Sequence, residues 1–399
     1  MMAILAKTIA DRSTFTVEKI DDSSRFAELQ LEWTDLLESS ASQCLFLTWE
    51  WLHTWWKHLA AGRRLSILAV RCGSQLAALA PFGVRPPSFS RRRLFPVQEF
   101  LGSGSAGSDY LDFIVREGCE PEARQALGSC LGGERPMLDW TQLRRDGCFA
   151  AGVASMLRQE GWRVQETRTN TCPLIRLTGE SWESYLATLG AEHRYNFNRK
   201  WKRLNREYVV EFEQVRTEEQ CRESIDLVIM LHNLRWRDRG GSDAFHTRGL
   251  VEFHQDFSQI ALARGWLRLY VLRLNGKPAA ALYGFLYDRT FYFYQSGFDA
   301  AYDKYSVGLV TMGLAIQRAI EEGAQEYDLL HGDEGYKSHW SNGSRELGRL
   351  ELYPPGSIGW MCRSSVELEL ASHRIARRVL PRRAFDGIRA KLNARQPCL

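Results

Sequence analysis

The sequence lacks long hydrophobic runs, paired cysteine motifs and a large excess of charge of either sign. No stretch of about 18 apolar residues occurs, so no membrane-spanning helix is expected. The opening MMAILAKTIADR has an apolar run too short, and too broken by Lys7, for a signal peptide, which predicts a cytoplasmic protein. Because 52 Lys and Arg residues nearly balance 48 Asp and Glu residues, the net charge predicts no DNA partner.

The nine cysteines are an odd number, and none lies in a C-x-x-C pair. Reduced thiols fit this pattern better than a disulfide framework or a structural zinc site. With 399 residues and 44% apolar content, the chain can bury a sizeable core, and its length suits two domains.

The order of predicted elements is that of an α+β protein. Residues 23–40, starting at a Ser cap, and 48–60 have helical spacing. Residues 65–85 predict a hairpin around Cys72-Gly73-Ser74. A flexible GSGSAGS stretch (102–108) precedes a strand in DYLDFIV (109–115), and helix, strand, helix and strand follow up to about Thr167.

The second half of the chain repeats part of the first. LAVRCGSQLAALAPF (68–82) resembles YVLRLNGKPAAALYGF (270–285): each has an Arg before a Gly turn, then an Ala-rich strand that ends in an aromatic residue. Chance similarity of two hairpins is the alternative to a tandem duplication. The duplication predicts an N-terminal lobe at 1–175, a C-terminal lobe at 176–356 and a basic helical tail at 357–399.

A helix is predicted where SVGLVTMGLAIQRAIEEG begins at Ser306, directly after the loop DAAYDKY. The unpaired backbone N–H groups at a helix start suit a pyrophosphate. Here Ser306, Val307, Gly308 and Leu309 would donate them, and Gly308 would allow close approach of a ligand. A purely structural Ser-capped helix is the alternative.

Two motifs, YDKYSVGLV and DLLHGDEGYKSHW, resemble those of the GNAT-superfamily acyltransferases of the CelD/BcsL type, relatives of the FemAB-like transferases with two GNAT-like halves. The resemblance covers roughly residues 15–355 and is strongest over 180–353. It implies two tandem lobes, each with a mixed, mainly antiparallel sheet flanked by helices. The sequence keeps one glycine of the standard GNAT phosphate loop. The matching positions are Tyr302, Tyr305, Ser306, Gly308, Asp328, Gly332, Glu334, Tyr336, Lys337 and Trp340.

Acyl transfer to an amine needs a proton acceptor and a group that polarises the carbonyl. Lys337 could supply positive charge at the oxyanion, or form an ion pair with a neighbouring acid. Glu334 or Asp328 could take the proton, and Tyr305 could reprotonate the leaving group. The candidate substrate-binding residues of this region are Tyr302, His331, Tyr336 and Trp340.

A metal site is not predicted from the same loop. His331, Asp333, Glu334 and His339 have ligand chemistry, but their spacing is neither H-E-x-x-H nor a familiar zinc pattern. His331 is instead expected to be a hydrogen-bonding loop residue or a secondary candidate base.

Three basic segments remain. AEHRYNFNRKWKRLNRE (191–207) predicts a helix that is either solvated or in contact with a phosphorylated substrate, with Arg194 and Arg199 the preferred residues. LHNLRWRDRGG (231–241) predicts a lid edge or a helix terminus. Residues 363–399 hold nine Arg and Lys and three Asp and Glu, which suits an amphipathic helix against an anionic membrane or a partner, or a terminal helix packed on the body.

The resemblance implies an N-acyltransferase that uses acetyl-CoA or another acyl-CoA as donor. The implied acceptor is an amino sugar or a glycan-linked amine in exopolysaccharide or cell-envelope synthesis. One alternative is a FemAB-like transferase that takes its acyl group from aminoacyl-tRNA. Another is a non-catalytic GNAT-like scaffold of a polysaccharide synthase, which the basic tail could contact.

Overall fold

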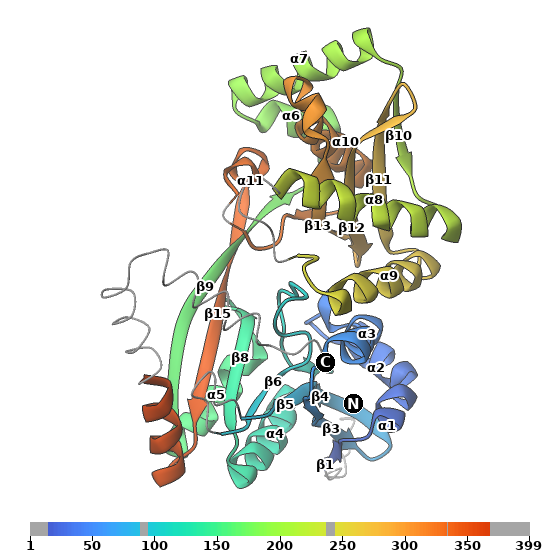
Figure 1. The fold of residues 1–399 in the computed structure, drawn as a ribbon. Coiled ribbons are helices and arrows are strands. Elements are labelled where there is room, and N and C mark those ends of the chain that lie inside the picture. The colour runs from blue at the N-terminus through green and yellow to red at the C-terminus, as the bar shows by residue number, and fades with distance from the viewer. Residues whose placement is uncertain (1–14, 88–94, 237–243, 333, 368–399) are drawn as a thin grey trace, which may run out of the picture.

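The computed structural model describes residues 15–87, 95–236, 244–332 and 334–367. Two lobes lie one above the other in Figure 1 and are connected by two long antiparallel strands, β9 (Arg163–Arg176) and β15 (Gly343–Tyr353). β9 leads from the N-terminal lobe into the C-terminal lobe, and β15 returns. The two lobes are therefore joined by hydrogen-bonded strands.

The N-terminal lobe contains the elements up to α5. They are β1 (Phe15–Ile20), α1 (Ser23–Glu28), α2 (Gln30–Glu38), η1 (Leu45–Leu47), α3 (Trp49–Leu59), β2 (Arg64–Leu65), β3 (Ile67–Cys72), β4 (Gln75–Ala80), β5 (Phe82–Arg85), β6 (Val97–Phe100), β7 (Ile114–Val115), α4 (Glu120–Glu134), β8 (Met137–Arg144) and α5 (Phe149–Gln159).

The C-terminal lobe follows β9. Its elements are α6 (Trp182–Thr188), α7 (Ala191–Glu207), β10 (Val210–Gln214), α8 (Glu218–Trp236), α9 (Arg248–Ala263), β11 (Leu267–Leu274), β12 (Lys277–Tyr287), β13 (Thr290–Phe298), η4 (Ala300–Tyr305), α10 (Val307–Glu321), β14 (Glu326–Asp328) and α11 (Gly335–Trp340). A further helix spans residues 357–367 after β15.

One sheet runs through both lobes. Its strand order is β10-β11-β12-β13-β14-β9-β15-β8-β6-β5-β2, and a separate four-stranded sheet has the order β1-β3-β4-β7. Most neighbouring strands are antiparallel, but β13 with β14 and β6 with β8 are parallel pairs. The expected α+β fold of two tandem lobes with mixed, mainly antiparallel sheets is confirmed.

The repeat extends to matching details of backbone and side chain. The β3–β4 hairpin has a register shift just before Arg71, and the β11–β12 hairpin has one just before Arg273. Arg71 pairs with Glu18 on β1, and Arg273 pairs with Glu213 on β10, each at 3.0 Å. A shared bulge and a shared cross-strand ion pair are more than two similar hairpins need, and they indicate a common ancestral lobe.

Two local expectations are wrong, and one strand is shorter than the sequence suggested. The side chain that caps α1 belongs to Asp22, which accepts from the Arg25 backbone N–H, and not to a serine. The expected strand within 109–115 is present as β7, which has only two residues. The stretch 102–108 is packed rather than flexible: Ser108 is buried and its hydroxyl accepts a 2.9 Å hydrogen bond from the Trp51 indole.

Candidate functional site

The junction of the lobes lies where β13 and β14 separate. These parallel strands pair only from Thr290 to Tyr292, after which β13 continues to Phe298 paired with β12 on its other side. A segment of the N-terminal lobe meets both strands here: the Ala106 carbonyl accepts from the Tyr294 hydroxyl, and Tyr110 contacts Asp328 at the end of β14. Both lobes therefore supply the site.

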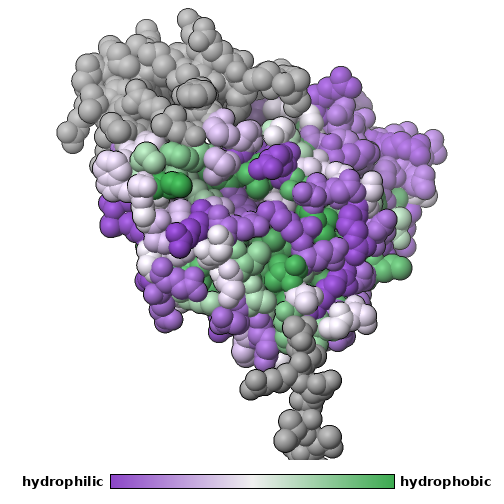
Figure 2. Space-filling view, turned by 90° about the horizontal axis from the view of Figure 1, so that it is seen from below, coloured by the Kyte–Doolittle hydropathy of each residue, from purple (hydrophilic) through white to green (hydrophobic). Residues whose placement is uncertain are grey.

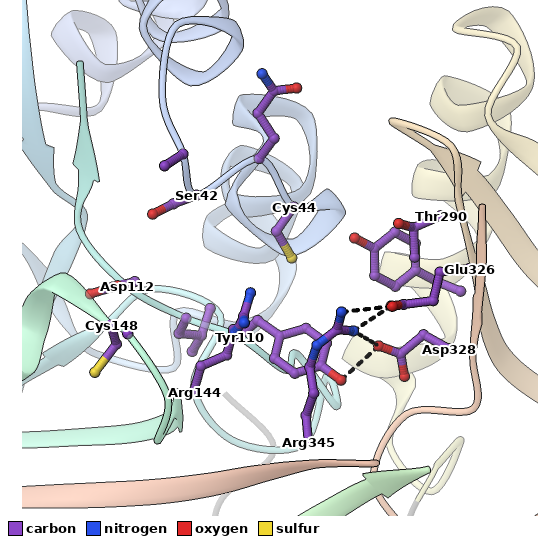
Figure 3. A pocket seen from close by; sticks show the side chains of 15 residues that line it. Ser42, Cys44, Tyr110, Asp112, Arg144, Cys148, Thr290, Glu326, Asp328 and Arg345 are labelled. Carbon is purple, nitrogen blue, oxygen red and sulfur yellow. Dashed lines mark hydrogen bonds and ion pairs between the residues drawn. The ribbon is translucent and has the colours of Figure 1, made fainter. Parts of the chain in front are cut away.

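Asp328 is the centre of a buried polar cluster (Figure 3). Its Oδ2 accepts a 2.6 Å hydrogen bond from the Tyr110 hydroxyl and lies 3.4 Å from Arg345, which also forms a two-pronged pair with Glu326. Its Oδ1 accepts from the Leu330 N–H at 2.8 Å. Burial raises the pKa of Asp328 to about 7, although Tyr110 opposes this by donating to the carboxylate.

A cavity of about 160 Å³ adjoins this cluster. Cys44 and Arg144 of the N-terminal lobe line it, together with Thr290 and Arg345 of the C-terminal lobe, as Figure 3 shows. Its walls carry guanidinium, carboxylate, hydroxyl and thiol groups. A small polar molecule with several hydrogen-bonding groups fits such a lining better than an acyl chain does.

His331 and Asp109 form a second polar pair beside the first. The His331 Nδ1 lies 2.7 Å from Asp109 Oδ1, and the His331 backbone N–H donates to Asp109 Oδ2 at 3.0 Å. A carboxylate only accepts, so Nδ1 holds the proton and Nε2 of the neutral ring is a proton acceptor. The His331 side chain is 34% exposed while Asp109 is fully buried. The hydrogen bond to Asp109 raises the pKa of His331.

Asp109 is itself held in place. Gln142 on β8 donates to its Oδ1 at 2.7 Å, and the Cys172 thiol on β9 lies 3.6 Å from its Oδ2. Strands of the N-terminal lobe thus fix the carboxylate that orients a histidine of the C-terminal lobe. An imidazole oriented by a buried carboxylate is an arrangement that enzymes use for general-base catalysis.

Lys337 pins the turn that carries His331. Its ammonium contacts the Leu330 carbonyl at 3.4 Å, the His331 carbonyl at 2.9 Å and Glu334 at 3.0 Å. The side chain is only 5% exposed. Gly332 makes this packing possible, because a Cβ there would lie 2.1 Å from the Glu334 carboxylate. Two carbonyls accept from the ammonium and Glu334 is its ion-pair partner, so Lys337 and Glu334 position the loop around His331.

Replacing Lys337 with methionine will lower the free energy of unfolding by about 1–3 kcal/mol, because Glu334 and two carbonyls lose their donor. Thermal unfolding measures the loss. Lys277→Met is the matched control, since Lys277 is exposed at the start of β12. Equal shifts for the two variants would contradict a buried anchoring role for Lys337.

Two other residues predicted to contact the substrate, Tyr336 and Trp340, differ from each other in burial. Trp340 is 1% exposed, and its carbonyl accepts from the Tyr185 hydroxyl at 2.7 Å, which makes it a packing residue. Tyr336 is partly buried, and the Arg235 guanidinium lies 5.6 Å from its ring. Arg235 also lies 5.2 Å from the Phe298 ring.

The start of α10 packs against Phe298, whose ring also contacts Arg235. A Cβ on Gly308 would lie 3.1 Å from the Phe298 ring, so this glycine makes room for packing. Ser306 has a left-handed backbone and makes no side-chain cap bond, which corrects the expected Ser cap. Val307 is buried, whereas Gly308 and Leu309 are partly accessible. The Ser306 side chain therefore does not accept a hydrogen bond from the backbone N–H groups in the first turn of α10.

Tyr305 and Tyr302 lie away from the His331 loop. The Tyr305 hydroxyl donates to Glu207 at 2.6 Å, near the C-terminal end of α7, and this bond raises its pKa. His193, near the other end of α7, contacts Trp340. Glu207 follows His193 by fourteen positions along the helix, which corresponds to about 21 Å at 1.5 Å per residue. The structure does not bring Tyr305 together with Lys337.

Helix α7 spans the predicted range, 191–207. Arg194 and Arg199 line a surface groove along it. Arg194 donates to the Ala187 carbonyl at 2.9 Å, and the Arg199 guanidinium lies 5.6 Å from the Tyr195 ring. Of the segment 231–241, residues up to 236 end helix α8, and the rest lies outside the described residues.

Sequence reasoning missed the N-terminal contribution, namely Asp109, Tyr110 and Gln142, and it also missed Arg345 on β15. A signal was present in the polar pair Asp109-Tyr110 directly after a Gly-rich stretch. No cluster of three or more metal-ligating side chains occurs among the described residues, which omit Asp333.

Comparison with known proteins identifies the fold of this site. Residues 191–338 match the family Acetyltransferase (GNAT) domain. This part of the chain is therefore similar to a GNAT acetyltransferase domain, and the matched span includes α7, α10 and the His331 loop. No curated protein matches the sequence.

Solved structures share the architecture over both lobes. FemX aligns with a TM-score of 0.56 and 11% identity, covering 79% of this chain and 95% of FemX. The C-terminal domain of a putative lysylphosphatidylglycerol synthetase from Agrobacterium fabrum aligns with a TM-score of 0.51 and 12% identity, covering 88% and 96%. A conserved protein of unknown function from Bacteroides thetaiotaomicron has a TM-score of 0.51 and 15% identity, covering 84% and 100%. At these identities the likeness shows the fold.

Proposed function

We propose that this chain is a cytoplasmic N-acyltransferase of the CelD/BcsL type. It moves an acyl group, acetyl in the simplest case, from acyl-CoA to the amine of an amino sugar or glycan-linked acceptor in exopolysaccharide or cell-envelope synthesis. The observation that carries the proposal is the His331–Asp109 pair at the lobe junction, within the span that matches a GNAT domain. Tyr110 and Asp328, which are close to this pair in the chain, line the polar cavity.

In the proposed reaction His331 is the general base. Its Nε2 takes a proton from the acceptor ammonium, and the free amine attacks the acyl carbonyl. The new C–N bond forms, the C–S bond of the thioester breaks, and the thiolate leaves with the second proton, which the amine nitrogen of the tetrahedral intermediate gives up. Asp109 accepts the hydrogen bond from Nδ1 of His331. Its negative charge therefore stabilises the imidazolium that forms.

The cavity at Asp328 is the proposed acceptor site. Carboxylates of Asp328 and Glu326 suit an ammonium, and hydroxyls such as that of Tyr110 suit sugar hydroxyls. The donor's pyrophosphate is assigned to the backbone N–H groups at the start of α10, residues 307–309. Arg194 and Arg199 are assigned to a phosphorylated part of either substrate.

A FemAB-like transfer from aminoacyl-tRNA is the second candidate. The architecture shared with FemX across both lobes favours it, and so does the single glycine kept from the standard GNAT phosphate loop. The chemistry at the acceptor amine is the same, but the leaving group is a ribose hydroxyl in place of a thiol.

The donor can be tested directly. Calorimetry with acetyl-CoA, followed by mass spectrometry of a reaction with glucosamine-containing acceptors, should show donor binding and an N-acetylated product. Absence of acyl-CoA binding together with transfer from aminoacyl-tRNA would select the second candidate. A His331→Gln variant that keeps full function in cells would point to the non-catalytic scaffold.

A further inference from the structure

The helix at residues 357–367 has one face attached to the N-terminal lobe. Figure 1 draws it in dark red at the lower left, after β15. Cys362 is 1% exposed and belongs to a small core cluster with Val97 and Met137, and Val366, one turn later, packs against this cluster. These contacts are enough to hold the helix on the lobe.

The same helix presents large apolar side chains to solvent. Trp360 is 70% exposed, Ile358 56% and Met361 42%. Only seven large hydrophobic side chains are exposed in the described part of the chain, and three of them fall within these four consecutive positions. The lower face of the molecule is otherwise largely hydrophilic, with hydrophobic residues between the charged ones (Figure 2). We call Ile358, Trp360 and Met361 the apolar triplet.

The sequence that directly follows the helix carries the positive charge of the protein. Residues 368–399 contain eight Lys and Arg and two Asp and Glu, a net charge of +6. The whole chain has a net charge of +4, so residues 1–367 are net negative by two charges. In the sequence, the basic character is therefore concentrated after the apolar triplet.

We propose that the apolar triplet and the basic sequence after it dock the protein on an anionic lipid bilayer. Trp is favoured at the membrane–water interface, where its apolar ring and its N–H are both satisfied. Cations beside such a residue are attracted by anionic headgroups. A single apolar anchor binds weakly, and an adjacent cluster of cations supplies the second signal that stable docking needs.

The chemistry of the triplet favours a bilayer over a nucleic acid. A nucleic-acid strand would also attract the cations, but it uses flat rings on which bases stack, and Ile358 and Met361 offer none. None of the helices in the described residues is long and apolar enough to cross a membrane. The proposed contact is thus at the bilayer surface, and it goes beyond the proposed acyl transfer without depending on it.

Co-sedimentation of the full chain with vesicles tests the proposal. We expect binding to phosphatidylcholine vesicles that contain phosphatidylglycerol, little binding to pure phosphatidylcholine, and weakening as salt is raised. Changing Ile358, Trp360 and Met361 together to serine should reduce the partition coefficient about tenfold or more. Reversing Arg377, Arg378, Arg382 and Arg383 to glutamate should reduce it roughly a hundredfold.

A matched control changes three other exposed apolar residues, Leu31, Val209 and Met230, to serine. This variant should bind vesicles as the unchanged protein does. Thermal unfolding should be alike for both serine variants, because all six side chains are exposed. Equal binding to neutral and anionic vesicles, undiminished binding by the triplet variant, or tRNA binding in place of vesicle binding would each overturn the proposal.

Discussion

Replacing His331 with glutamine will lower kcat/KM for acyl transfer by about 10²–10⁴-fold, because the acceptor ammonium loses its proton acceptor. Glutamine keeps a polar group at the position, and Asp109 can still accept from the His331 backbone N–H. The variant should therefore fold. Steady-state kinetics with the donor that the binding test identifies measures the loss of activity. Thermal unfolding measures any loss of stability separately.

The pH profile distinguishes a base from a structural residue. Catalysis needs the neutral imidazole, so the rate should rise with pH and level off above the pKa of His331. Asp109 raises this pKa above the ordinary value of about 6.5. Asp109→Asn removes the carboxylate, so the rise should move to lower pH while the plateau falls. The same bond stabilises the native state at low pH, and this contribution fades as pH rises through the folded pKa.

His246 provides the matched control. It is an exposed histidine before α9, and His246→Gln should leave both the rate and the pH profile unchanged. An Asp109→Asn profile that falls in height without moving along the pH axis would contradict the assignment of His331 as the base.

Replacing Arg345 with methionine will destabilise the protein by about 3–5 kcal/mol, because one buried and one partly buried carboxylate lose their counter-charge. Asp328 is fully buried and the Glu326 side chain is 16% exposed. Without Arg345 the pKa of Asp328 should rise further above about 7, since Arg345 now lowers it. The loss should therefore be largest at high pH and smaller where the carboxyls are protonated. Calorimetric unfolding across pH measures it.

Two further variants sharpen this result. Adding Glu326→Gln and Asp328→Asn to Arg345→Met should recover much of the loss, because no uncompensated charge remains. Arg168→Met is the exposed control: Arg168 on β9 is 57% exposed and pairs with Glu346 on the same sheet. It should cost no more than about 1 kcal/mol. If Arg345→Met costs as little as this control, the cluster is not shielded from solvent in the way the structure indicates.

Local patterns were sufficient for most of the fold. The Asn275-Gly276 turn and the alternating strands around it predicted the β11–β12 hairpin, because turn chemistry and side-chain alternation act between near neighbours. The apolar face after Ser306 predicted α10 for the same reason. The capping of α1 by Asp22 was not predicted, since Ser23 next to it is an equally suitable cap by type.

The candidate site could be predicted from the sequence less completely than the fold. Asp328, His331 and Lys337 were predicted as site residues because they lie in one short stretch of polar residues and glycines. Their contacts were not predicted, because contacts depend on partners elsewhere in the fold. Lys337 has three acceptors within its own turn, and that geometry appears only when Leu330 and Gly332 take their positions in the folded chain.

The sequence by itself determined most of the elements and singled out the loop of residues 329–340, because both depend on interactions between residues close in the chain. The tertiary structure alone decided that Asp109 contacts this loop and that Tyr110 contacts Asp328 just before it. They lie 222 and 218 positions from His331 and Asp328, and the long strands β9 and β15, together with the packing of α3 on α9, bring the lobes together. Burial then fixes which groups are bases and which are anchors, since the solvent around a side chain sets its pKa.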